Sequence, residues 1–186
     1  MRNFYRLLDG LDTGPVLHAL QAQPNLWNGI KTRTSDYVTA HSEVEDIVLR
    51  FASGADEGVP ELDRLRHELI MAEMPAWKCL PQVRPLIFGL MRQVEGECLG
   101  RVFISRLAPG KKILPHTDKV GAYSDFYRRY HIVLQGHPGS VFHCADETVQ
   151  MLTGEIWTFN HMFDHSVVNN SATDRIHLIA DIKPCP

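Results

Sequence analysis

From residue 154 to residue 184 the chain reads GEIWTFNHMFDHSVVNNSATDRIHLIADIKP, and this stretch indicates how the second half of the protein folds. Three short segments in it, 155–159, 165–169 and 175–182, are rich in the β-branched and aromatic residues typical of strands. A turn signal, Asn169-Asn170-Ser171, separates the last two. Short strands joined by such turns favour a sandwich or a barrel.

The same pattern extends upstream to residue 98. Five further candidate strands precede the quoted stretch, and they cover residues 98–107, 111–116, 129–135, 140–144 and 147–151. Turn signals such as Pro109-Gly110 and Thr153-Gly154 separate them. Eight short strands are typical of jelly rolls. We therefore predict a mainly β protein.

The first 97 residues predict a mixture of helix and strand. Apolar spacing and cap signals predict helices over 16–23, 61–74 and 84–95, and a strand over 44–51. These helices would buttress one face of the sheet. The sequence has no internal repeat or flexible linker, so we expect one domain over 1–186. Within it, 1–97 would be mixed support and 98–186 would carry the catalytic strands.

Composition excludes several function classes. The 186 residues carry a formal net charge of -3, which gives no electrostatic reason to expect nucleic acid or an anionic membrane as partner. The four cysteines have no paired spacing and are interpreted as reduced thiols. The sequence has neither a signal-peptide pattern nor an apolar stretch of about 20 residues. We expect a cytoplasmic protein, and the oligomeric state is not legible from the sequence.

Histidines cluster in the strand-rich half, where seven of the ten lie between residues 116 and 177. His116 and Asp118 are two residues apart, so in an extended segment both side chains point to one face. His165 is a third candidate ligand. Two imidazoles and one carboxylate leave coordination positions open, as in non-haem Fe(II) oxygenases. Zinc would fit the same residues nearly as well, and a lone H-x-D motif more often caps a turn or faces solvent.

A cationic pattern accompanies the candidate metal ligands. Strand alternation places Arg175, His177, Ile179 and Asp181 on one face of 175–182. An arginine inside a barrel is costly unless it pairs with an anion, and its planar fork suits a carboxylate. Arg129 and His131 likewise share a face of their strand. Together these residues indicate a pocket for a dianion.

Three stretches together resemble the aspartyl/asparaginyl β-hydroxylase family of Fe(II)/2-oxoglutarate-dependent oxygenases. They are ISRLAPGKKILPHTD (104–118), RYHIVLQG (129–136) and the stretch quoted above, so the resemblance covers about residues 103–184. It implies a double-stranded β-helix core of the jelly-roll or cupin-like kind. It also implies Fe(II), 2-oxoglutarate and O₂ as reactants in the hydroxylation of an unactivated C–H bond.

The resemblance also implies roles for single residues. His116 and His165 would bind iron, and Asp118 would complete the triad, although the best-known animal member has glycine at that position. Arg175 would grip the distal carboxylate of 2-oxoglutarate. Further contacts to the co-substrate would come from Ser105, Arg129 and His131. The segment between His116 and His131 is longer than in that member, so substrate specificity is not transferred across it.

The sequence gives less information about the substrate than about the metal or the co-substrate. An amino acid or amino-acid-like molecule, free or in a peptide, is favoured because the compact chain lacks the helical repeats that the animal enzyme carries for protein substrates. Polar residues that could line the cavity mouth are Arg33, His41, Arg50 and Asp125, although each is more often a surface residue. Two other functions stay open: a cupin-like metalloenzyme that does not use 2-oxoglutarate, and a non-catalytic sensor of iron and 2-oxoglutarate. Arg175 argues against the first, because such an enzyme needs no carboxylate clamp.

Overall fold

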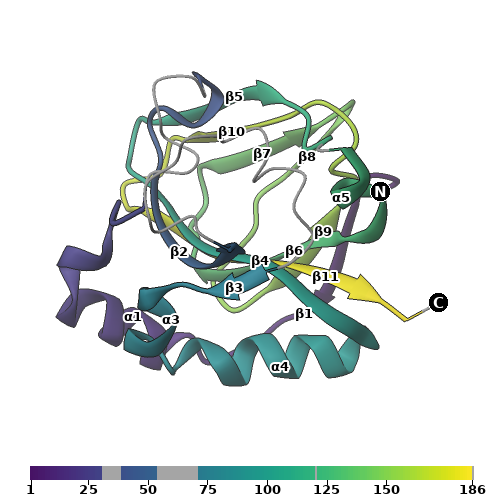
Figure 1. Ribbon diagram of the computed structural model, residues 1–186. Helices are drawn as coiled ribbons and strands as arrows, with labels where there is room; N and C mark the ends of the chain where they lie inside the picture. The colour runs from purple at the N-terminus through teal and green to yellow at the C-terminus, as the bar shows by residue number, and fades with distance from the viewer. Residues whose placement is uncertain (31–38, 54–70, 120, 186) are drawn as a thin grey trace.

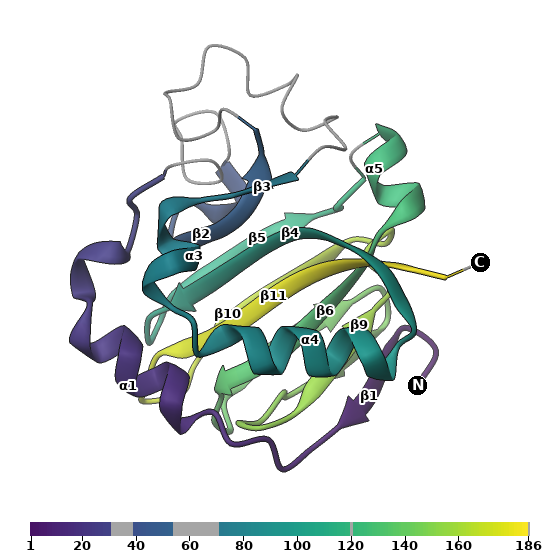
Figure 2. The same ribbon diagram turned by 60° about the horizontal axis from the view of Figure 1, so that its bottom comes forward.

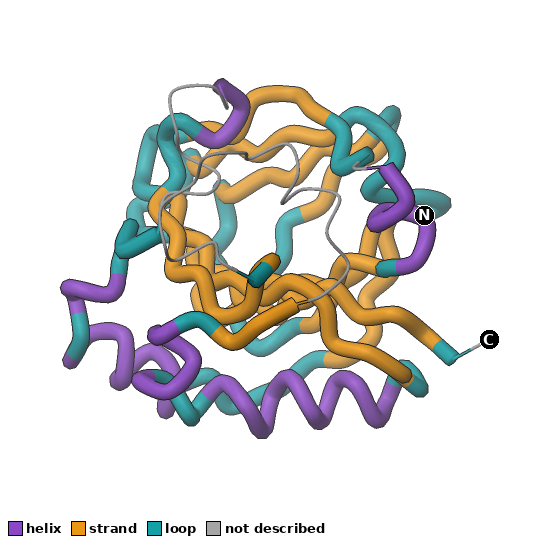
Figure 3. The backbone as a smooth tube through the Cα atoms, in the orientation of Figure 1, coloured by secondary structure: helices purple, strands orange, loops and turns teal. Residues whose placement is uncertain are grey.

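Two antiparallel sheets face each other and enclose the centre of the molecule (Figure 1). The computed structural model describes residues 1–30, 39–53, 71–119 and 121–185. Its strands form two layers, and its longer helices lie together below the larger one (Figure 3). The described part of the chain is thus a mainly β, double-stranded β-helix core with buttressing helices, as predicted.

The larger sheet has seven strands in the order β1-β9-β6-β11-β4-β2-β3. In that order the strands are Phe4–Leu8, Ile156–Phe159, Arg128–Gln135, Arg175–Pro184, Gly96–Leu107, Glu45–Ala52 and Met71–Glu73. The smaller sheet has the order β5-β10-β7-β8. Its strands are Lys112–His116, His165–Asn169, Ser140–Cys144 and Glu147–Val149.

Helices cover the outer face of the larger sheet. Figure 2 shows α1 (Gly14–Ala22) and α4 (Val83–Gln93) lying across it, with α3 (Pro75–Cys79) beside β2 and β3. Short helices η1 (Pro24–Leu26), η2 (Thr39–His41) and α5 (Gly121–Phe126) complete the described secondary structure. Apolar residues of α1, α3 and α4 pack on the sheet in one continuous core, and burial of this apolar surface holds the helices there.

Alternation along β11 divides its side chains between two environments. Ile176, Leu178, Ala180 and Ile182 belong to the core under the helices. The residues between them face the space between the two sheets, where a second apolar core includes Phe142, Phe159 and Trp157. The central strand therefore presents its polar residues, Arg175 and His177 among them, to the interior, as its two-residue period predicts.

The predicted elements compare well with the structure, with one correction. All eight strands predicted after residue 98 are present, and so are helix α1, strand β2 and helix α4. The helix predicted over 61–74 is wrong at its end, because Met71–Glu73 pairs with β2 as strand β3. The next residue, Met74, is extended ahead of Pro75, which disfavours helical geometry in the residue before it. The rest of that prediction, 61–70, lies outside the described residues.

Some elements were not predicted. The strand β1 and the short helices α3 and α5 have too few residues to show a period. Of these, β1 pairs with β9 and extends the larger sheet, and Phe4 enters the core between the sheets.

Candidate metal centre and its pocket

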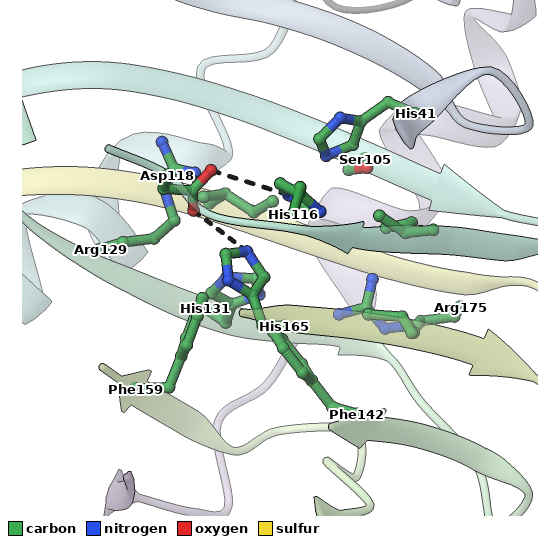
Figure 4. A pocket seen from close by; sticks show the side chains of 13 residues that line it. His41, Ser105, His116, Asp118, Arg129, His131, Phe142, Phe159, His165 and Arg175 are labelled. Atoms are coloured by element: carbon green, nitrogen blue, oxygen red, sulfur yellow. Dashed lines mark hydrogen bonds and ion pairs between the residues drawn. The ribbon is translucent and has the colours of Figure 1, made fainter. Parts of the chain in front are cut away.

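A pocket lies between the two sheets, and both contribute side chains to it (Figure 4). The strands β4, β6, β9 and β11 of the larger sheet form one wall, and β5, β7 and β10 of the smaller sheet form the other. The lining residues are His41, Ser105, Ile113, His116, Asp118, Arg129, His131, Phe142, Phe159, His165, Val167, Arg175 and Ile179. All seven residues predicted to bind metal or co-substrate are among them.

The three predicted metal ligands come together at one end of this pocket. One ligand atom from each of His116, Asp118 and His165 lies within 4.8 Å of the others. Sheet register brings the two imidazoles together, because β5 and β10 pair with His165 opposite His116. Their ring centroids are 4.2 Å apart. The two histidines are far apart in the sequence, and the pairing of β5 with β10 brings them together.

Backbone contacts orient both imidazoles. Nδ1 of His116 lies 2.8 Å from the carbonyl oxygen of Leu114, and Nδ1 of His165 lies 3.0 Å from that of Phe163. A carbonyl only accepts, so each Nδ1 carries the ring proton. Each Nε2 is then a bare lone pair that faces the Asp118 carboxylate, at 3.8 Å and 3.4 Å. Fixing the ring tautomer through the distal nitrogen is how proteins prepare histidines for metal binding.

Asp118 is held as a carboxylate. Burial alone would raise its pKa, but the Arg129 guanidinium outweighs burial and keeps the pKa well below its usual value. Its backbone N–H donates to the carbonyl oxygen of His161 at 3.1 Å. A deprotonated carboxylate and two Nε2 lone pairs form a donor set ready for a divalent cation.

Arg129 links this carboxylate to a second one. Its Nη1 donates to Asp118, while Nε and Nη2 donate to the two oxygens of Asp181 at 2.8 Å and 2.9 Å. Burial would lower the pKa of Arg129, but the two carboxylates raise it well above its usual value. Within the described residues Arg129 thus faces two acids, in addition to lining the pocket.

A second polar cavity lies behind Asp118 and shares Arg129 with the main pocket. Arg101 and Tyr123 lie in it, with the guanidinium carbon of Arg101 3.9 Å from the centroid of the tyrosine ring. The Tyr123 hydroxyl donates to Asp181 at 3.2 Å. Sequence reasoning missed this cavity, although the position of Asp181 on the inner face of its strand was a signal for it.

At the other end of the pocket lies Arg175, whose residue is only 3% exposed. Its guanidinium carbon lies 5.7 Å from the centroid of the Phe142 ring, and its Nη2 donates to Nδ1 of His177 at 3.1 Å. Ser105, on the neighbouring strand, is 1% exposed, and its hydroxyl has no hydrogen-bond partner among the described residues. A buried cation and a buried unpaired hydroxyl in one pocket indicate a polar ligand.

Aromatic rings line the side of the pocket between these two ends (Figure 4). The ring centroids of Phe142 and Phe159 are 4.8 Å apart, and that of Phe159 is 4.8 Å from the centroid of His165. Phe159 lies in the core between the sheets and also lines the pocket. Phe142 was not singled out, although its place in a two-residue period was a signal.

Of the four predicted substrate residues, three lie in the described part of the chain, and one of these lines the pocket. His41 lines the pocket, with its ring centroid 4.5 Å from that of His116. Arg50 lies elsewhere and donates to the carbonyl oxygens of Gly100, Leu99 and Met71. Asp125 is exposed on α5 and does not line the pocket. Arg33 lies outside the described residues.

Comparison with known proteins places the chain in a family. A double-stranded β-helix with two histidines and one carboxylate at one end of a polar pocket has the arrangement typical of non-haem iron oxygenases. The family model for the Aspartyl/Asparaginyl beta-hydroxylases matches residues 73–184, well over half of the chain. The chain belongs to this family.

Among the relatives is an L-proline cis-4-hydroxylase of Rhizobium meliloti (strain 1021), which is 28% identical over 141 residues. The match covers 75% of this chain and 47% of the relative, so the chain spans about half the length of that curated protein.

Solved structures share the fold. A Pseudomonas putida prolyl-4-hydroxylase matches with a TM-score of 0.55 at 11% identity, covering 100% of this chain and 95% of that one. A 2OG-Fe(II) oxygenase family oxidoreductase from Burkholderia pseudomallei matches with a TM-score of 0.53 at 13% identity, covering 75% and 66%. In the described ranges, none of the helices has the length and apolarity needed to cross a bilayer.

Proposed function

We propose that this protein is an Fe(II)- and 2-oxoglutarate-dependent dioxygenase that hydroxylates an unactivated C–H bond of an amino acid or amino-acid-like substrate, free or in a peptide. One observation carries the proposal. The cluster of His116, Asp118 and His165 opens into the same pocket as a buried arginine, Arg175. The cluster suits a divalent metal, and the arginine suits the far carboxylate of a chelating diacid.

The donor set fits Fe(II). Two imidazole nitrogens and one carboxylate bind one face of an ion and leave other positions open for a co-substrate and O₂. Bound iron would supply the redox chemistry that couples decarboxylation of 2-oxoglutarate to C–H hydroxylation. The contribution of the chain is to hold the ligands through Leu114, Phe163 and Arg129, and to keep water from the pocket with Phe142 and Phe159.

Arg175 supports the choice of a diacid as co-substrate. Its guanidinium can form two parallel hydrogen bonds with a carboxylate, and burial strengthens such a charge-assisted pair. The unpaired hydroxyl of Ser105 lies on the adjacent strand and can donate to the same group. A ligand that enters between Arg175 and the three candidate metal ligands would contact both Arg175 and Ser105.

The relative supports the substrate class. It is an L-proline cis-4-hydroxylase, and its match covers 75% of this chain.

Binding of metal and co-substrate is tested without oxygen. Fe(II) and 2-oxoglutarate added anaerobically should give the weak visible charge-transfer band of the chelate. His116→Ala and His165→Ala should lose this band because each removes a ligand. Arg175→Met should keep Fe(II) binding and weaken 2-oxoglutarate binding about tenfold or more, since a buried charged hydrogen bond is lost. Unchanged affinity for 2-oxoglutarate in Arg175→Met would refute the role of Arg175.

Turnover is tested by succinate release in the presence of O₂. A panel of free amino acids and short peptides, with L-proline included, should contain a compound that stimulates release above the uncoupled rate. The product should carry one additional oxygen by mass spectrometry. If the chelate band forms but no member of the panel stimulates release, the proposed substrate class is wrong while the assignment of the metal and co-substrate stands.

A further inference from the structure

Three buried side chains on the inner face of the larger sheet form a chain of hydrogen bonds. Arg175 and His177 lie on β11, and His131 lies on the adjacent strand β6, opposite Ile179. Nη2 of Arg175 is 3.1 Å from Nδ1 of His177, which is itself 3.1 Å from Nδ1 of His131. Their exposed fractions are 3%, 0% and 5%. Water therefore does not compete for these contacts.

The direction of these bonds follows from Arg175. A guanidinium only donates, so Nδ1 of His177 accepts and carries no proton. Burial, followed by the charge of Arg175, lowers the pKa of both histidines well below the usual value, so each ring is neutral and holds one proton. His177 then has its proton on Nε2. His131 can contact a bare Nδ1 only by donating, so its proton is on Nδ1 and its Nε2 is a lone pair.

This arrangement is unsuited to an anionic ligand. His131 lines the pocket, and its Nε2 has no hydrogen-bond partner among the described residues. A lone pair at that position repels a carboxylate oxygen, whereas an N–H would bind it. The state of His131 that Arg175 enforces through His177 is therefore the wrong one for a dianion in the pocket.

We propose that His177 is a positioning residue that couples Arg175 to His131, so that arrival of the dianion on Arg175 reverses the tautomers of both histidines. This inference rests on the proposed function. Once Arg175 turns its N–H groups to the carboxylate of the co-substrate, Nδ1 of His177 no longer has to accept. His177 then donates from Nδ1 to Nδ1 of His131, and His131 presents an N–H at Nε2.

Protons balance in this exchange. The proton between the two Nδ1 atoms passes from His131 to His177. One proton leaves Nε2 of His177 and one is taken up by Nε2 of His131. Because His177 is 0% exposed in the ligand-free structure, we place this exchange with water during ligand entry, while the side chains of the pocket move. Both rings are neutral before and after, so no net proton is taken up.

The position of Arg175 supports such a movement. Its side chain lines the pocket, and it contacts His177 through a hydrogen bond from Nη2 to Nδ1. When the N–H groups of Arg175 turn to the carboxylate of the diacid, this hydrogen bond breaks and releases His177.

The tautomers can be read directly by ¹⁵N NMR of histidine-labelled protein, because protonated and bare ring nitrogens differ widely in chemical shift. In the metal-free protein we expect the proton of His131 on Nδ1 and that of His177 on Nε2. In protein loaded with diamagnetic Zn(II) and saturated with 2-oxoglutarate we expect both assignments to be reversed. Zn(II) alone should leave them as in the free protein. Identical tautomers with and without 2-oxoglutarate would overturn the proposal.

Two variants separate coupling from mere packing. His177→Phe keeps the ring volume but removes both nitrogens, so 2-oxoglutarate affinity should fall about tenfold to a hundredfold while Zn(II) affinity stays unchanged. His177→Asn retains an amide at the position of Nδ1 that can accept or donate by rotation, so affinity should stay within about threefold of wild type. Equal losses in the two variants would make His177 a packing residue only. His137, exposed in the β6–β7 turn, provides the matched control, His137→Phe.

Failure of the proposed function gives a different result. Wild-type protein that binds Zn(II) but not 2-oxoglutarate would contradict the proposed co-substrate, whatever the histidines do. The metal-free spectrum tests the coupling in either case. A proton on Nε2 of His131 in metal-free protein would overturn the coupling even if 2-oxoglutarate binds with high affinity.

Discussion

Arg129 supports the proposed metal site without being one of its candidate ligands. Its guanidinium lies between the carboxylates of Asp118 and Asp181 and donates to both. If Asp118 binds the proposed metal ion, the ion would take up part of its charge, and Asp181 would be the main counter-charge of Arg129. The second acid would therefore allow Asp118 to bind a metal ion without leaving a buried arginine unpaired.

Asp181→Asn tests this role. Removal of one charge from a buried, hydrogen-bonded pair should lower the free energy of unfolding by about 3–5 kcal/mol. Arg129 would then compete with the metal for Asp118, so metal affinity should fall about tenfold to a hundredfold, as for other residues that hold a ligand in place. Urea unfolding and Zn(II) titration measure the two effects.

A matched change at the surface provides the control for Asp181→Asn. Asp9 pairs with Arg6 at 3.8 Å, and both side chains are at least half exposed. Asp9→Asn should leave metal affinity at the wild-type value, because such exposed pairs contribute little. Wild-type metal affinity in Asp181→Asn itself would show that Asp118 does not need this support.

At the scale of the elements, the short helix α5 is fixed against the larger sheet by two stacked tyrosines. The ring centroids of Tyr123 and Tyr127 are 4.4 Å apart, and the Tyr123 hydroxyl accepts from the backbone N–H of Arg101 at 2.8 Å. Both rings lie against Gly100, where a side chain would meet Cε1 of Tyr127 at 2.7 Å. The close approach requires glycine at this position.

Gly100→Ala should therefore displace α5. The cost should be about 1–3 kcal/mol of the free energy of unfolding, as for other forced insertions into packed regions. Metal affinity should fall as well, because α5 follows Asp118 closely in the chain. Urea unfolding and Zn(II) titration measure both. The control is Gly89→Ala in α4, where an added methyl meets nothing within 4 Å and should raise stability by up to about 1 kcal/mol.

Some of these elements could be predicted from the sequence and others could not. The strands after residue 98 were predictable because alternation and turn residues define them locally. Strand β3 was not, since Met71–Glu73 becomes a strand only by pairing with β2, and its local sequence continues a helical pattern. The pocket-lining residues of β11 were predictable from alternation. The contact between Arg129 and Asp181 was not, because it depends on the register between β6 and β11.

At the scale of the whole molecule, the buried histidines make stability depend on pH. Burial, followed by the charge of Arg175, lowers the pKa of His131 and His177 in the folded protein. Below about pH 6.5 the unfolded chain binds protons that the folded chain does not, so folding loses stability as pH falls. Each histidine should contribute a slope of roughly 1.4 kcal/mol per pH unit.

Urea unfolding of the metal-free protein at pH 7.5, 6.5 and 5.5 measures this dependence. The free energy of unfolding should be nearly constant from 7.5 to 6.5 and should decline below that. His177→Phe should show a smaller slope, since it retains only one of the two histidines. Equal stability of the wild type at pH 7.5 and 5.5 would contradict neutral burial of this pair.

The order of the strands has a consequence for synthesis on the ribosome. Strand β11 lies in the middle of the larger sheet, between β6 and β4, yet it follows every other strand of the described chain (Figure 1). Strands β6 and β4 therefore leave the ribosome before β11. Their edges stay unpaired and their apolar faces stay exposed until residues 175–184 leave the exit tunnel. A nascent chain of this topology is exposed to aggregation until its last strand arrives, and the same late event delivers Arg175 to the pocket.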